Sequence, residues 1–192
     1  QHEIINSILQ NENTLVIITS DNGADYNGSA GNLRGRKTQS FEGGQRVPLI
    51  VKWKNNFPEG LESGEMAMNI DFFPSILSLL EIPLPNDRQI DGKNMMPILE
   101  GGKSEHEVVY YTSAWTGEIS GVRNQRYKYH TKGLSTAIPM YKIFGMVGYV
   151  KPQLNDLLLD NESHNLIKKH PNQAKDLKSK LDEKSAELEA NP

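Results

Sequence analysis

The chain opens with two apolar patterns of different period. Within residues 1 to 13 apolar side chains recur at helical spacing, which predicts the last turns of an amphipathic helix. The next run, Leu15 to Ile18, is unbroken and rich in β-branched residues. Such a run predicts a strand that helices cover on both faces, as in a parallel or mixed sheet. The first part of the chain therefore indicates an α/β fold.

Later patterns extend this arrangement. Residues 47 to 53 predict a second strand, and the apolar face that follows Asp71 predicts a core helix with Asp71 as its cap. Short aromatic and β-branched runs separated by turns then predict an antiparallel sheet. These runs are residues 108–112, 119–123 and 127–130. A terminal helix is expected after Pro171, with its Lys and Glu residues facing water.

Composition limits the functional classes. The 192 residues include 21 basic and 24 acidic ones, a balance that gives no bulk attraction for nucleic acid. Without cysteine, the chain has no disulfide and no thiolate metal site. No apolar run approaches the roughly 20 residues that a membrane-spanning helix needs. Because the sequence starts at Gln1 with neither an initiator methionine nor a leader pattern, we expect it to be a piece of a longer protein.

The first candidate chemistry follows the first strand. Asp21 and Asn22 come directly after it, where open α/β sheets gather their ligands. A carboxylate and an amide carbonyl are hard oxygen donors, which suit Ca²⁺ or Mg²⁺ better than Zn²⁺. The pair followed by glycine is also typical of a tight turn, so these residues alone leave both interpretations open.

A glycine-rich basic loop follows this pair. Glycines let a backbone approach a ligand closely, and clustered cations suit a tetrahedral oxyanion. The glycines are Gly31, Gly35, Gly43 and Gly44, and the cations are Arg34, Arg36, Lys37 and Arg46. The loop does not contain the Gly-rich Lys-Ser/Thr pattern of a standard phosphate loop.

Three blocks of this stretch resemble the second signature of the type I sulfatases, especially the arylsulfatase A-like branch. They are Asp21-Asn22-Gly23, Leu33-Arg34-Gly35-Arg36-Lys37 and Phe41-Glu42-Gly43-Gly44-Gln45-Arg46-Val47-Pro48. Later blocks, including Asp71 to Leu77 and Pro97 to Leu99, extend the match in the family's order. The resemblance implies that Asp21 and Asn22 are Ca²⁺ ligands. It also implies that Lys37 contacts the sulfate group, as a catalytic and substrate-binding residue.

The resemblance further implies the carboxyl part of an alkaline-phosphatase-like mixed sheet flanked by helices. A small antiparallel sheet would follow it, with residues 152–157 resembling the family's last strand, and then a C-terminal helix. We expect residues 1–103 to belong to the large domain and residues 104–192 to the small one. The implied activity is metal-assisted hydrolysis of a sulfate ester of a small molecule or glycan. In the family the nucleophile is a formylglycine in the N-terminal half of the enzyme. Its motif is not present here, so the chain alone is predicted to be inactive and to need that half as a partner.

Two alternatives stay open. One is a related metal-dependent phosphoric or phosphonic ester hydrolase, because fold does not determine substrate. The other is a non-catalytic module of the same fold. Sulfatases of this type are usually exported or lysosomal, and the sequons at Asn27 and Asn161 are compatible with that. His130 is expected on an edge strand, at the surface and outside the site. In the family, the region corresponding to residues 134–150 often helps to select the substrate.

Overall fold

The computed structural model describes residues 13–112, 117–131 and 151–190. The segment 134–150 and, apart from residue 13, the helix expected in residues 1–13 fall on residues outside this description. The chain divides into two compact units, one formed by residues 1–21 and 47–107 and the other by residues 22–46 and 108–192. The basic loop thus groups with the C-terminal sheet, and the expected domain boundary near residue 103 stays a prediction.

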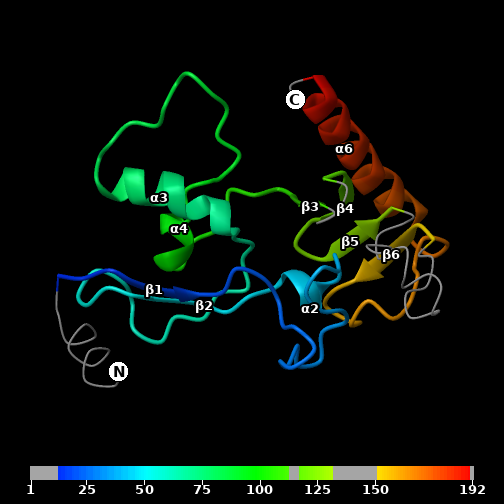
Figure 1. Cartoon of the computed structure of the whole chain (residues 1–192), viewed down its shortest axis with the longest axis horizontal. Coiled ribbons are helices and arrows are strands. Elements are labelled where there is room, and N and C mark those ends of the chain that lie inside the picture. Colours follow the sequence, from blue (N-terminus) through cyan, green and yellow to red (C-terminus); the bar gives the residue numbers. More distant parts are fainter. Residues whose placement is uncertain (1–12, 113–116, 132–150, 191–192) are drawn as a thin grey trace. The chain divides into compact units, whose positions relative to one another are not determined.

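The first unit is built on a pair of short strands. Strand β1 (Val16–Thr19) pairs antiparallel with β2 (Leu49–Lys52), as Figure 1 shows. Both strands were predicted from the sequence. The expectation that β1 is covered on both faces is not met within this unit, because Ile18 is 50% exposed and its cross-strand partner Ile50 is 59% exposed.

The helices of this unit are short. A single 3-10 turn, η1 (Asn69–Asp71), leads into α3 (Phe72–Leu79), and α4 (Met96–Leu99) follows. The helix after Asp71 was predicted, but the role given to Asp71 was wrong. Its carboxylate does not cap α3 and instead accepts hydrogen bonds from the backbone N–H groups of Met68 at 2.7 Å and Lys93 at 2.8 Å. Nε2 of His106 lies 2.9 Å from both carboxylate oxygens.

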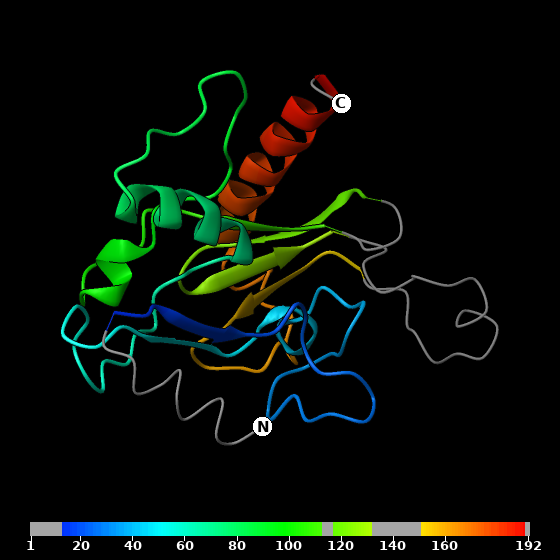
Figure 2. The same cartoon turned by 60° about the vertical axis from the view of Figure 1, so that its left-hand side comes forward.

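The second unit contains a four-stranded antiparallel sheet in the order β3-β4-β5-β6. Its strands are β3 (Val109–Thr112), β4 (Ile119–Arg123), β5 (Tyr127–His130) and β6 (Gln153–Asp156). All four predicted strands are therefore present. The terminal helix α6 (Pro171–Ala190) lies along one face of the sheet (Figures 1 and 2).

The two faces of this sheet differ in character. On one face, Leu177 and Leu181 of α6 pack in an apolar cluster with Val122, Tyr129 and Leu154. Because successive side chains of a strand point to opposite faces, Lys128 and His130 on either side of Tyr129 project from the other face. There Glu42 of the short helix α2 (Glu42–Gln45) contacts the sheet. The loop of residues 22–46 thus covers the face that α6 leaves open.

Candidate functional site

The predicted metal ligands lie just beyond the end of β1. Asp21 is exposed and Asn22 is partly buried, and the hydroxyl of Ser20 donates to Oδ1 of Asp21 at 3.4 Å. The donor chemistry, one carboxylate and one amide carbonyl, fits a hard cation. Calcium takes six to eight oxygen ligands, so these two residues could form only part of a site. Among the described residues no group of three or more His, Asp or Glu side chains could hold a metal ion.

The basic loop is folded back on itself by backbone hydrogen bonds. The N–H of Gly23 donates to the carbonyl of Gly44 at 3.0 Å, and that of Gly43 donates to Arg34 at 2.7 Å. The N–H of Lys37 donates to Ala24 at 2.9 Å. A Cβ on Gly23 would overlap the carbonyl oxygen of Gly43, so this close approach requires glycine.

Two of the loop's cations bind backbone oxygens of the second unit. Arg34 donates to the backbone carbonyl of Glu162, and its guanidinium lies 4.1 Å from the ring centroid of Phe41. Arg36 donates to the carbonyls of Asp25 and Gly28, each at 2.7 Å. These contacts bind both arginines to backbone oxygens, which makes them structural.

Lys37 differs from these arginines. Its side chain is exposed, and within the described part of the chain no hydrogen bond or ion pair holds its ammonium group. It stands in a turn next to Thr38, whose φ of 76° is unusual for a β-branched residue. A backbone held in this conformation presents the side chain of Lys37 from a constrained turn.

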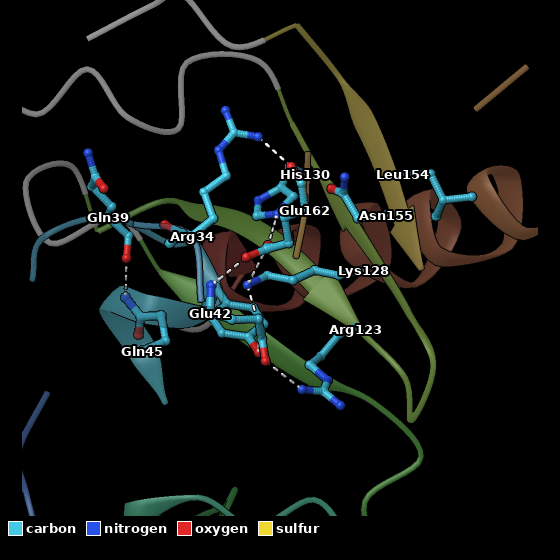
Figure 3. Close-up of polar contacts among 12 residues, drawn as sticks. Arg34, Gln39, Glu42, Gln45, Arg123, Lys128, His130, Leu154, Asn155 and Glu162 are labelled. Atoms are coloured by element: carbon cyan, nitrogen blue, oxygen red, sulfur yellow. Dashed lines mark hydrogen bonds and ion pairs between the residues drawn. The ribbon is translucent and has the colours of Figure 1, made fainter. Parts of the chain in front are cut away.

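A buried charged cluster, which sequence analysis missed, lies beneath the loop. It consists of Glu42, Lys128, His130 and Glu162 (Figure 3). Nζ of Lys128 lies 2.8 Å from Glu42 and 3.2 Å from Glu162, and Nε2 of His130 lies 2.8 Å from Glu162. Arg123 adds a contact of 2.8 Å to Glu42. The signal in the sequence was the alternation Tyr-Lys-Tyr-His in β5, which places Lys128 and His130 on one face.

The placement of His130 corrects a prediction. It was expected at the surface on an edge strand, but β5 lies between β4 and β6 and the side chain is fully buried. Burial lowers the pKa of His130 to about 4, an effect that Lys128 reinforces and that the hydrogen bond to Glu162 only partly offsets. The neutral ring donates from Nε2 to Glu162, and within the described part of the chain its buried Nδ1 has no partner.

The same surroundings shift the pKa of two other groups. Burial alone would raise the pKa of Glu42, but Lys128 and Arg123 outweigh it, and the net shift is downward. Burial and the charge of Glu42 raise the pKa of Tyr111, whose hydroxyl donates to Glu42 at 3.0 Å. At neutral pH the cluster therefore contains ionised Glu42 paired with cations and a neutral histidine.

Comparison with known proteins places these features in a family. The chain is similar to solved sulfatases of the alkaline-phosphatase-like fold. A crystal structure of PsFucS1 sulfatase from Pseudoalteromonas sp. matches with a TM-score of 0.79 and 27% identity, covering 94% of this chain and 38% of that one. The family model Sulfatase matches residues 4–82. The predicted α/β class is thus confirmed.

Two curated human proteins agree with this result. Arylsulfatase A of Homo sapiens is 34% identical over 173 residues, which are 81% of this chain and 34% of that protein. Steryl-sulfatase of Homo sapiens is 38% identical over 119 residues, 55% of this chain and 20% of that protein. The chain belongs to the sulfatase family, and it spans between a fifth and about a third of the length of these relatives.

Proposed function

We propose that this chain supplies part of the active site of an arylsulfatase-like sulfuric ester hydrolase. In this proposal Lys37 binds the sulfate group, and Asp21 and Asn22 contribute ligands to a calcium ion. The substrate is a sulfate ester of a small molecule or a glycan. Family membership supports the reaction class, because the relatives named above are sulfatases.

The observation that carries this proposal is the difference between Lys37 and its neighbours. Arg34 and Arg36 bind backbone carbonyls of the same unit, whereas the ammonium of Lys37 is exposed with no such partner in the described residues. A cation that the fold does not use, presented by a constrained turn, is suited to an anionic ligand.

Hydrolysis of a sulfate ester needs a nucleophile, stabilisation of charge on the sulfate oxygens and a proton for the leaving oxygen. The chain's own contribution is to the second requirement, since Lys37 would place a positive charge against those oxygens. A calcium ion held partly by Asp21 and Asn22 would polarise the same oxygens as a Lewis acid. The formylglycine nucleophile and the proton donor would come from the N-terminal half of the enzyme.

The apolar surface of the first unit supports this need for a partner segment. Large apolar side chains of the strand pair and of the α3 region are at least half exposed or nearly so: Ile18, Ile50, Ile70, Phe73, Leu80, Ile82 and Leu84. Exposed apolar residues in such number are typical of a surface that another segment covers. We assign this role to the preceding part of the large sheet.

None of the helices in the described ranges is long and apolar enough to cross a membrane. Both sequon asparagines, Asn27 and Asn161, are exposed and therefore accessible to a glycan. We propose an exported or lysosomal location, in keeping with the sulfatase family.

The decisive experiment is substitution of Lys37 in the protein translated from the complete coding sequence. Lys37→Ala should lower kcat/KM for p-nitrophenyl sulfate by about 100-fold, the effect of removing one group that stabilises an oxyanion. Bound calcium, measured by atomic emission, should not change. Lys175→Ala removes the same charge from an exposed position on α6 and serves as the control. An unchanged rate for Lys37→Ala would exclude Lys37 from the site.

The same full-length protein without any substitution tests the two alternative functions, a phosphoric ester hydrolase and a non-catalytic module. Hydrolysis of p-nitrophenyl phosphate in preference to the sulfate would favour a phosphoric ester hydrolase. Hydrolysis of neither ester would favour a non-catalytic module. For the metal, Asp21→Asn should lower the calcium content, because it removes the charged ligand. A calcium content equal to that of the unaltered protein would remove Asp21 from the proposed ligand set.

A further inference from the structure

The buried cluster connects the basic loop to the sheet. Lys128 and His130 belong to β5, Glu42 begins α2 within the loop, and Glu162 lies in the turn that follows β6. Each of these side chains is almost completely inaccessible to solvent. None of them could touch a substrate, so their role must be exerted through other residues.

Glu162 holds several parts of the unit at once. Its Oε2 accepts a hydrogen bond from the backbone N–H of Glu42 at 2.7 Å, while Oε1 contacts Lys128 and His130. Its backbone carbonyl accepts from Arg34, as Figure 3 shows. Glu162 also has a φ of 64°, a left-handed conformation that is uncommon outside glycine. A residue kept in that conformation by so many contacts indicates that its position is closely determined.

Glu42 holds the loop from the other side. Its carboxylate contacts Lys128, Arg123 and the hydroxyl of Tyr111, at distances between 2.8 and 3.0 Å. Buried ion pairs rarely add net stability compared with apolar residues of the same volume, but their directional contacts can specify one arrangement. The charged contacts of Glu42 are therefore suited to fixing the position of the loop on the sheet.

The attachment reaches Lys37 through backbone hydrogen bonds. Glu42 is followed by Gly43 and Gly44, whose backbones bond to Arg34 and Gly23 respectively. Lys37 is bonded in turn to Ala24, one residue beyond Gly23. A shift of α2 would therefore move the segments at Gly23 and at Arg34, which hold the turn at Lys37 in place.

We propose that Glu42 and Glu162 are positioning residues that set the location of the Lys37 ammonium. The inference rests on the proposed function, in which Lys37 binds sulfate. The two carboxylates act by fixing residues 22–46 against the sheet, with Lys128 as the shared cation between them. They do not take part in the reaction themselves.

A double-mutant cycle in the protein translated from the complete coding sequence tests this role. Glu42→Gln should lower kcat/KM for p-nitrophenyl sulfate by about tenfold, because small displacements of a binding group are costly. In the Lys37→Ala background the same substitution should have less than about a twofold effect, since contacting or coupled residues are not additive. Equal losses in both backgrounds would overturn the proposal, because a general loss of structure does not depend on Lys37.

A second pair of variants separates the proposed role from a folding defect, because each variant removes only one hydroxyl group. Tyr111→Phe removes one hydrogen bond to Glu42 and leaves the ring in place, and it should show the same dependence on Lys37 with a smaller effect. Tyr110→Phe is the matched control, because the adjacent hydroxyl contacts Lys180 of α6 on the opposite face. If Tyr110→Phe and Tyr111→Phe reduce kcat/KM equally, the proposal fails.

Amide hydrogen exchange gives a readout that does not depend on activity. In Glu42→Gln and Tyr111→Phe, exchange at the N–H groups of Gly23 and Lys37 should be faster, while exchange in β4 should not change. Unchanged exchange in the loop would refute the anchoring role. If Lys37→Ala alone leaves kcat/KM unchanged, the proposed function fails, and the exchange data still decide whether the two glutamates anchor the loop.

Discussion

Nε2 of His130 lies 2.8 Å from Oε1 of Glu162, yet burial keeps the pKa of the imidazole near 4. The histidine therefore donates a hydrogen bond as a neutral ring and adds no charge to the cluster. Lys128, which contacts the same carboxylate oxygen at 3.2 Å, supplies the positive charge. A buried carboxylate shared by a lysine and a neutral histidine makes the second unit sensitive to pH.

The free energy of unfolding should fall as the pH is lowered from about 6.5 to about 4. Over this interval the histidine takes up a proton in the unfolded chain but not in the folded one, so protons favour unfolding. The slope attributable to His130 is at most about 1.4 kcal/mol per pH unit. The lowered pKa of Glu42 adds a further loss below its ordinary value near 4.5, because folding then requires an ionised carboxylate.

Urea unfolding at several pH values measures this dependence. His130→Gln should reduce the slope between pH 6.5 and 4, whereas His164→Gln, at a side chain that is 79% exposed, should not. Identical slopes in all three proteins would show that His130 takes up its proton over the same pH range in the folded and unfolded states, and that burial does not lower its pKa.

The sheet was predictable because its signal is local, but the burial of His130 was not. Alternating aromatic and polar residues in 127–130 indicate a strand whatever surrounds it. Whether that strand lies at an edge depends on its pairing with β6, whose residues come more than twenty positions later. The sequence around Glu162 is polar and typical of an exposed turn, and only its tertiary contacts show that the side chain is buried.

The residues of the candidate site and Asp71 likewise separate into features with a local sequence signal and features that depend on tertiary contacts. Asp21, Asn22 and Lys37 were proposed as site residues from motif blocks and stay predictions; the structure adds that Lys37 differs from Arg34 and Arg36, which bind backbone carbonyls. Asp71 was placed correctly before α3, but helix patterning could not reveal that its carboxylate would bind the backbone N–H groups of Met68, in the preceding turn, and of Lys93, 22 residues later. The burial of His130 and the contact between Asp71 and Lys93 both depend on residues more than twenty positions apart in sequence.

Gly44→Ala should reduce activity by displacing the turn that carries Lys37. An added Cβ would overlap the backbone carbonyls of Arg36 and Gln39, the residues on either side of that turn. We expect kcat/KM for p-nitrophenyl sulfate to fall at least about tenfold in the protein from the complete coding sequence. Gly64→Ala is the control, because a Cβ there meets nothing within 4 Å. Wild-type kinetics in Gly44→Ala would mean that the loop tolerates a shift.

Asp71→Ala should destabilise the first unit strongly. Its carboxylate accepts from the backbone N–H groups of Met68 and Lys93 and contacts His106, and it is 1% exposed. Removing it leaves buried donors without an acceptor, at a cost of about 2–5 kcal/mol in the free energy of unfolding. Asp87→Ala, where the carboxylate forms an exposed pair with Arg88, should change that free energy little. Equal values for the two variants in urea unfolding would contradict the structural role of Asp71.

The exposed isoleucines of the strand pair test whether another segment covers the first unit. Ile18 and Ile50 face each other across β1 and β2, so they share one face of the pair. If the preceding part of a large sheet packs on this face, Ile50→Lys buries an unpaired charge in the protein from the complete coding sequence. The free energy of unfolding should then fall by more than about 2 kcal/mol.

The matched control for Ile50→Lys is Leu159→Lys, in the turn after β6, where the side chain is 79% exposed. A lysine at a position that stays in water changes stability by no more than about 0.5 kcal/mol. A small effect at both positions would mean that the apolar face remains in solvent and that no partner segment covers it. A large effect at Ile50 alone would show that this half-exposed residue belongs to the core of a larger domain, as the proposed division of the active site requires.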